Sequence, residues 1–160
     1  MVVLVERDVV TKLIIVEDHR YDNLYPLTYM RPVFELRCGA TSLAEKIRHA
    51  AGFGAAGFGA AGFGAGSVAY FVRDWLRESY AEKSNAPVND LSQLEGDVLF
   101  VNGRLLADGK CDLRSIGPNE VLKTGGTIVA SGVRKSCATL SRDSRMARIR
   151  AWFLSSRVLN

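Results

Sequence analysis

Charged and polar side chains follow two apolar runs that have the composition of buried strands. Asp18 comes just after the run Lys12–Val16, and Asn102 and Arg104 lie at the end of the run 97–104. Parallel strands end at one edge of a sheet, where open α/β proteins bind their ligands. A carboxylate there can hold a divalent cation, and an arginine can bind phosphate oxygens in pairs. These residues predict a site for a phosphorylated ligand, although a turn asparagine and a solvated arginine are equally simple readings of Asn102 and Arg104.

Three further arginines lie in or near the segment that follows the first run, namely Arg20, Arg31 and Arg37. Each guanidinium can bind a phosphate or pair with a neighbouring carboxylate. Glu17, next to Asp18, can cap a turn or help to hold a metal ion, and its position favours the cap.

Strand and helix patterns alternate along the chain. The apolar run Lys12–Val16 predicts a buried strand, and Ser42 with Glu45 forms a capping-box pattern that predicts a helix over Leu43–Ala50. Further expected elements are a strand at 68–72, a helix at 75–83, a strand within 97–104 and a hairpin at 121–130. This order predicts an α/β fold with a Rossmann-like, mostly parallel sheet and flanking helices.

Residues 51–65 repeat Ala-Gly-Phe-Gly-Ala three times without a change. Glycine at this density disfavours helix and strand, so the repeat predicts a flexible surface loop. A glycine-rich phosphate cradle is the less favoured reading, because a cradle has defined, non-repeating positions.

The charge distribution divides the chain in two. Residues 132–160 carry seven basic residues against one acidic residue, a net +6, so residues 1–131 carry −2 of the total +4. We therefore expect an α/β domain over 1–131 and a basic tail over 132–160 that is not part of the core. A basic amphipathic helix at 145–159 for a membrane surface is the alternative reading.

Composition excludes several classes of protein. The 160 residues are 48% hydrophobic, which is too apolar for a disordered chain and enough for one core. The sequence contains no long apolar run and no secretory signal, so we predict no membrane span and no export. An odd number of widely spaced cysteines (Cys38, Cys111 and Cys137) argues against disulfides and zinc and fits the cytoplasm. The basic charge is confined to the tail, so no nucleic-acid partner is predicted.

Several short sequence motifs occur in an order typical of one enzyme family. These motifs are Tyr25-Pro26-Leu27-Thr28, Arg31-Pro32-Val33-Phe34-Glu35-Leu36-Arg37-Cys38-Gly39, Leu43-Ala44-Glu45-Lys46, Tyr70-Phe71-Val72-Arg73-Asp74-Trp75-Leu76, Pro87-Val88-Asn89-Asp90 and Val101-Asn102-Gly103-Arg104. Over about residues 12–130 the chain resembles the sugar nucleotidyltransferase-like family. Within it, the likeness is to the branch of bifunctional N-acetylglucosamine-1-phosphate uridylyltransferases. Members of that branch are longer, so the chain is expected to be the first, truncated part of such a protein.

The resemblance implies a nucleotidyltransferase-type domain whose partners are a nucleoside triphosphate, an amino-sugar 1-phosphate and a magnesium ion. The sugar phosphate would attack the α-phosphorus, and pyrophosphate would leave. The resemblance makes Arg31 the candidate catalytic residue, Arg20, Arg37, Asn102 and Arg104 the candidate substrate-binding residues, and Asp18 the candidate magnesium ligand.

The sequence also departs from the common form of this family. Residues 18–23, in the place of a glycine-rich loop, contain no glycine; Val33 stands where a lysine is usual, and Asn102 where an aspartate binds magnesium. An amide binds a hard cation more weakly than a carboxylate. Two alternatives therefore stay open, a non-catalytic nucleotide-sugar-binding or assembly module and a truncated product without activity of its own. The oligomeric state is left open.

Overall fold

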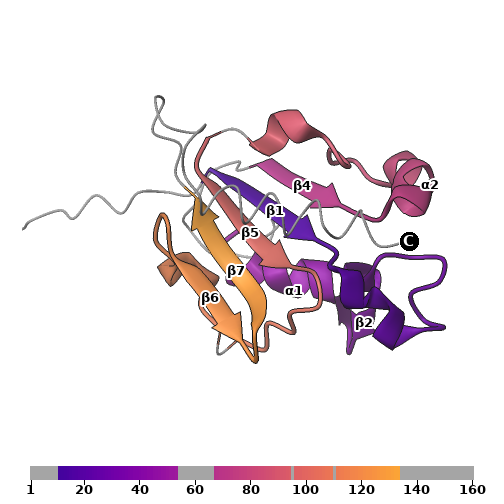
Figure 1. The fold of residues 1–160 in the computed structure, drawn as a ribbon, viewed down its shortest axis with the longest axis horizontal. Helices are drawn as coiled ribbons and strands as arrows, with labels where there is room; N and C mark the ends of the chain where they lie inside the picture. The colour runs from indigo at the N-terminus through magenta and orange to yellow at the C-terminus, as the bar shows by residue number, and fades with distance from the viewer. Residues whose placement is uncertain (1–10, 54–66, 95, 110, 134–160) are drawn as a thin grey trace, which may run out of the picture.

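A five-stranded sheet forms the centre of the molecule (Figure 1). The computed structural model describes residues 11–53, 67–94, 96–109 and 111–133. The strands lie in the order β4 (Ser67–Phe71), β1 (Lys12–Val16), β5 (Val98–Asn102), β7 (Thr127–Val133) and β6 (Val121–Thr124). β1 pairs in parallel with β4 and β5, whereas β7 pairs antiparallel with β5 and β6. Four of the five strands therefore run in one direction, and the predicted mostly parallel α/β sheet is confirmed.

Strand β1, which lies between β4 and β5, is buried on both faces, as its uninterrupted apolar run predicts. Side chains alternate across a strand, so Leu13 and Ile15 belong to a cluster on one face and Ile14 and Val16 to a cluster on the other. The second cluster also contains Ala69, Phe71, Val98, Phe100 and Val133.

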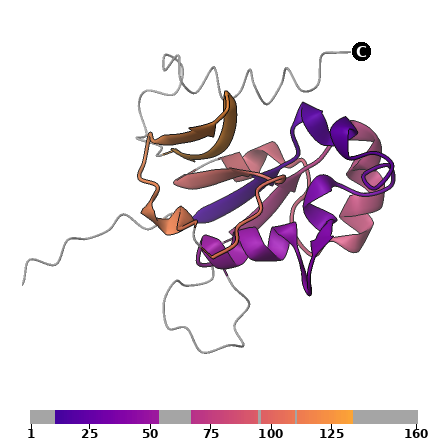
Figure 2. The same ribbon diagram turned by 90° about the horizontal axis from the view of Figure 1, so that it is seen from below.

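Helix α1 (Leu43–Ala50) packs on the first face of the sheet, as Figure 2 shows. It follows the short hairpin of β2 (Arg37–Cys38) and β3 (Thr41–Ser42). The Ser42 hydroxyl accepts from the Glu45 amide at 3.2 Å, and the Glu45 carboxylate accepts from the Ser42 amide at 2.6 Å. The predicted capping box and helix are confirmed at both ends, with Leu43 and Ile47 buried.

The segment after β4 differs from the prediction. In place of one helix over 75–83, a 3-10 turn (η3, Asp74–Leu76) precedes a shorter helix α2 (Arg77–Lys83). The amides of Leu76 and Arg77 bond to carbonyls three residues earlier, and no side chain caps the first turn of α2. Leu76 and Tyr80 still bury their side chains in the first cluster.

Residues 87–89 run along the outer edge of β4. The Tyr70 amide donates to the Pro87 carbonyl at 2.9 Å, and the Asn89 amide donates to the Tyr70 carbonyl at 2.8 Å. Asn89 adopts φ 52°, and its side-chain amide pairs with both backbone groups of Val72. The short 3-10 turn η4 (Leu91–Leu94) follows and leads toward β5.

The predicted hairpin at 121–130 is confirmed, with Gly125 and Gly126 both at positive φ in its turn. The 3-10 turns η1 (His19–Leu24), η2 (Val33–Glu35) and η5 (Leu113–Ser115) complete the described elements. Strand β7 continues through Val133, which is buried and pairs with Val98, so the sheet extends two residues beyond the expected boundary at 131. Most of the repeat (54–65) and the tail from residue 134 lie outside the described residues.

Candidate functional site

The candidate site lies where β1, β4 and β5 end side by side. Glu17 and Asp18 follow β1, Arg73 lies two residues after β4, and Asn102 ends β5 with Arg104 just beyond it. From β1 the chain continues to β4 on one side, and from β5 it continues to β6 and then β7 on the other. The carboxyl ends of β1 and β5 therefore form a topological switch point, the place where open α/β sheets bind ligands.

Asp18 is the buried centre of this edge, with 2% of its surface exposed. Arg104 donates to its carboxylate in a fork, from Nε at 2.8 Å and from Nη2 at 2.6 Å. The side-chain amide of Asn102 donates at 2.9 Å, and the backbone amide of Arg20 at 3.2 Å. Two bonds from the charged guanidinium and two from neutral amides thus compensate the charge that burial leaves without water.

Asn102 organises the end of β5 around this carboxylate. Its Nδ2 also donates to the Ile128 carbonyl at 3.3 Å, and its Oδ1 accepts from the Arg104 amide at 3.0 Å. Gly103 then donates to the Val16 carbonyl at 2.7 Å, and a Cβ there would lie 2.8 Å from a ring carbon of Phe34. A glycine is needed at this position because β1 and η2 pass so close.

The side chain of Arg20 reaches from η1 to the start of β7. Its Nη1 donates to the Thr127 hydroxyl at 3.1 Å. The structure therefore brings four of the sequence candidates together at one edge, namely Asp18, Arg20, Asn102 and Arg104.

Arg31 and Arg37 lie apart from the cluster around Asp18 in the described contacts. Arg31 is exposed, and its carbonyl accepts from Arg73 at 3.3 Å. Arg37 is exposed on β2 and lines a hollow of about 340 Å³ between α1 and the buried tyrosines. The other lining residues of that hollow are Glu35, Ser42, Ala44, Glu45, Arg48, Tyr70 and Tyr80. Among the described hydrogen bonds, neither side chain joins the Asp18 cluster, so their assigned roles stay predictions.

Sequence reasoning did not single out Arg73, and for Glu17 it favoured a turn cap. Glu17 is buried and accepts from Arg73 Nη1 at 2.9 Å, from the Arg73 amide at 3.3 Å and from the Val33 amide at 3.0 Å. Burial raises the pKa of Glu17, and Arg73 and the two amides oppose that rise. The signal that could have found this pair is that Glu17 and Arg73 each follow the carboxyl end of a strand that reads as parallel.

Arg73 also holds the loop over the end of β4. Its Nη2 donates to the carbonyls of Thr28, Tyr29 and Arg31, the last two at 3.4 and 3.3 Å. Its guanidinium carbon lies 4.4 Å from the ring centre of Tyr21 and 5.1 Å from that of Trp75. One buried cation thus connects β1, β4 and the segment before η2.

The side chains present do not fit a magnesium ion in this arrangement. A magnesium ion needs oxygen ligands that face it, whereas both oxygens of Asp18 already accept from Arg104. The described residues contain no group of three acidic, histidine or cysteine side chains suited to a metal ion. Magnesium at Asp18 stays a prediction, and no step proposed below uses it.

Comparison with known protein families assigns the chain to one of them. A family described as sugar nucleotidyl transferase matches residues 13–155. The chain belongs to this sugar nucleotidyl transferase family. The match confirms the resemblance at the level of the family, and the amino-sugar branch stays a prediction.

The family match extends further than the resemblance in the sequence, which was expected to end near residue 130. It includes residues 132–155, most of the segment expected to be a separate tail. No curated protein and no solved structure gives a significant match to the chain. Within the part of the chain that the structure describes, no helix has the length and apolarity to cross a membrane.

Proposed function

We propose that the chain binds a nucleoside triphosphate and an amino-sugar 1-phosphate beyond the ends of β1 and β5 and transfers the nucleotidyl group between them. Membership of the sugar nucleotidyl transferase family supports the reaction class. The observation that carries the location is the convergence of Arg20, Asn102 and Arg104 on buried Asp18 at the switch point.

The reaction concentrates negative charge on phosphate oxygens. A phosphate oxygen of the sugar 1-phosphate bonds to the α-phosphorus, and the bond from that phosphorus to its bridging oxygen breaks. Pyrophosphate leaves with the electron pair. The protein's part in such chemistry is to align the two phosphates and to stabilise their charge with cations.

Two guanidinium groups at the edge are arranged for this task. Arg104 uses Nε and Nη2 for Asp18, and among the described contacts its Nη1 makes no hydrogen bond. Asp18 therefore orients Arg104 and leaves one donor pair for a phosphate. Arg20 contacts Thr127 at the same edge and offers a second cation to the phosphates.

Binding is tested first, by isothermal calorimetry with uridine triphosphate and N-acetylglucosamine 1-phosphate, with and without magnesium. A charge-assisted contact contributes roughly 1.5–3 kcal/mol, so Arg20→Ala should weaken nucleotide binding about ten- to a hundredfold. Arg114→Ala is the matched control, because Arg114 is an exposed arginine that pairs with Asp112 on η5. No heat from a folded chain at millimolar ligand would contradict the proposal.

A second candidate is a module that binds the nucleotide sugar without turnover. Two observations favour it: Arg104 engages both oxygens of Asp18, and Asn102 stands where the family resemblance implies an aspartate for a metal ion. An assay of pyrophosphate release separates the two candidates. Release that depends on both substrates supports the transferase, and binding without release supports the module.

A further inference from the structure

Four aromatic rings gather on the surface next to the candidate site. Tyr21, Tyr25 and Tyr29 come from η1 and the loop after it, and Trp75 comes from η3. We call these four side chains the aromatic platform. Neighbouring ring centres are 5.5 to 6.3 Å apart, in edge-on and tilted arrangements.

The platform is exposed to an extent that is unusual for large apolar side chains. Trp75 is 59% exposed and Tyr29 60%, and Met30, which follows Tyr29 in the chain, is 77% exposed. Tyr25 and Leu27 are exposed as well. A continuous patch of this kind marks a binding surface more often than single scattered residues do.

The rings are held in place from beneath. The guanidinium of Arg73 lies against the rings of Tyr21 and Trp75. The same guanidinium donates to the carbonyl of Tyr29, and the Thr28 hydroxyl donates to the Tyr21 carbonyl at 2.8 Å. A surface whose side chains are already ordered loses less entropy when a ligand binds.

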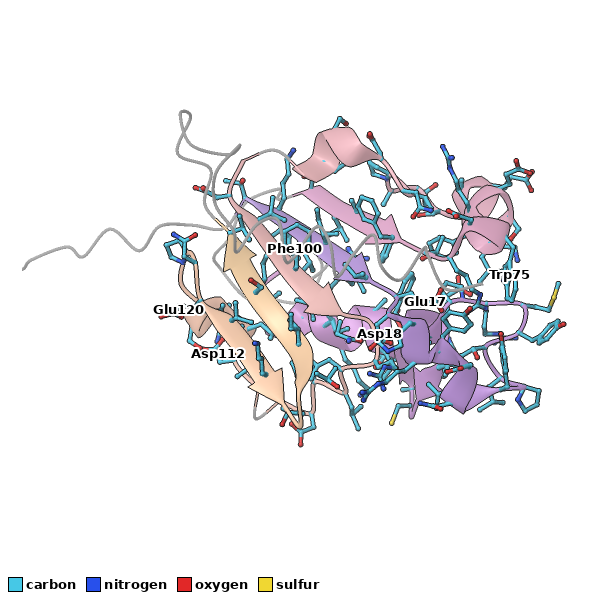
Figure 3. All side chains as sticks on the ribbon, in the orientation of Figure 1. Glu17, Asp18, Trp75, Phe100, Asp112 and Glu120 are labelled. Atoms are coloured by element: carbon cyan, nitrogen blue, oxygen red, sulfur yellow. The ribbon has the colours of Figure 1, made fainter. Side chains whose placement is uncertain are left out.

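The platform is continuous with the carboxyl edge of the sheet. Arg73 bonds to Glu17, which precedes Asp18, and Tyr21 directly follows Arg20. Figure 3 shows Trp75 beyond Glu17 and Asp18, on the side of β4. A ligand whose phosphates lie at Asp18 and the arginines would extend its remaining part toward these rings.

We propose that the aromatic platform stacks the base of the nucleoside triphosphate, an inference that rests on the function proposed above. A nucleobase is flat and offers a π-face to Tyr and Trp rings. The hydroxyls of a sugar would instead need several polar partners, whereas the exposed residues Leu27 and Met30 of the same loop are apolar. Stacking does not read hydrogen-bonding edges, so uridine and adenosine triphosphates should use the platform alike.

The test compares uridine triphosphate with inorganic tripolyphosphate, which carries the phosphates without a base. Trp75→Ala and Tyr29→Ala should each weaken nucleotide binding about tenfold and leave tripolyphosphate binding unchanged, since a stacked base contributes through its ring alone. Trp75→Phe should retain most of the affinity. Leu122→Ala, an exposed apolar residue on β6, is the control for removal of an exposed side chain.

Fluorescence gives an independent readout. The chain has two tryptophans, so Trp152→Phe leaves Trp75 as the sole indole. Uridine triphosphate should quench its emission, and tripolyphosphate should not.

The outcomes separate this inference from the proposed function. If uridine triphosphate and tripolyphosphate bind but both alanine variants keep wild-type affinity for the nucleotide, the platform inference is wrong and the function stands. An equal loss for both ligands would mean that the rings act only through Arg73, which also overturns it. A dimer in sedimentation that Trp75→Ala dissociates would make the platform an interface between copies instead. If neither ligand binds, the proposed function fails together with the inference.

Discussion

Two adjacent carboxylates at the end of β1 are each paired with an arginine from a different neighbouring strand. Glu17 forms an ion pair with Arg73, which follows β4, and Asp18 forms one with Arg104, which follows β5. β4 and β5 flank β1 on its two sides, so each of the two consecutive acidic residues after β1 pairs with the arginine that follows a different neighbouring strand. A buried carboxylate without such a partner would be costly.

Removal of Arg104 should therefore destabilise the fold. Arg104→Met would leave Asp18 buried with the amide of Asn102 and a backbone amide only. A fully buried pair broken in this way costs about 3–5 kcal/mol, and because the Arg104 side chain is 25% exposed we expect about 2 kcal/mol. Urea unfolding followed by circular dichroism measures the change.

Two further variants show whether the effect comes from the uncompensated carboxylate. Asp18→Asn in the Arg104→Met background should recover part of the lost stability, because the neutral amide needs no cation. Arg114→Met breaks an exposed pair and should change stability by less than about 1 kcal/mol. Equal losses for Arg104→Met and Arg114→Met would contradict the explanation.

At the scale of elements, local signals predicted α1 better than α2. The capping box places the start of α1 at Leu43 because both of its hydrogen bonds lie within four residues. No such cap precedes Arg77, and the chain there first forms the 3-10 turn η3, whose Leu76 joins the core. Burial of Leu76 and Tyr80 decides the conformation of this segment, and burial depends on the tertiary fold rather than on neighbouring residues in the sequence.

The capping box also predicts a dependence on pH. Hydrogen bonds from Ser42 lower the pKa of Glu45 below its usual value of 4.5. The folded-state pKa is thus below the unfolded one, so this contribution to stability is present above about pH 4.5 and is lost as pH falls through the folded pKa. Glu45→Ala should cost about 0.5–1 kcal/mol at pH 7, with little difference from wild type at pH 3.

Chemical denaturation at the two pH values, under matched salt, measures this difference. A gap between wild type and Glu45→Ala that widens in acid would contradict the assignment of the effect to the ionised carboxylate.

The segment between α1 and β4 contains the repeat, and we expect a shorter connection to suffice. Ala51 is buried and Phe53 packs against the first cluster, so the first copy is kept. Deletion of residues 56–65 should change the free energy of unfolding by about 1 kcal/mol or less, because closure entropy depends only on the logarithm of loop length. A loss of several kcal/mol in thermal or urea unfolding would mean that the later copies pack.

At the scale of the whole molecule, strand β7 continues past residue 131, where the α/β domain was expected to end. Gly132 and Val133 pair with Leu99 and Val98, and Gly132 passes so close to Gly117 that a Cβ would lie 2.3 Å from its carbonyl oxygen. A chain cut after Ser131 loses these two paired residues, whereas a chain cut after Val133 keeps all of β7.

The two truncations should therefore differ in stability. We expect the chain that ends at 131 to be less stable by about 2 kcal/mol, mainly because the buried Val133 side chain is lost. Parallel urea titrations of the two truncated chains and the full chain measure this. Identical midpoints for the two truncations would show that the sheet does not depend on the last two residues of β7.

The sequence by itself determined the order of strands and helices, the mostly parallel sheet and the membership of a sugar nucleotidyl transferase family. These depend on apolar periodicity, capping residues and short motifs, which act over a few residues. It also placed Asp18, Asn102 and Arg104 at strand ends, and so predicted one edge for them. Only the tertiary structure decided that Arg104 pairs with Asp18 across 86 positions, that Arg73 joins Glu17, and that rings from two segments form the aromatic platform. Such pairs depend on which strands become neighbours and on the need to compensate buried charge. The spacing of residues close together in the sequence predicts neither of these.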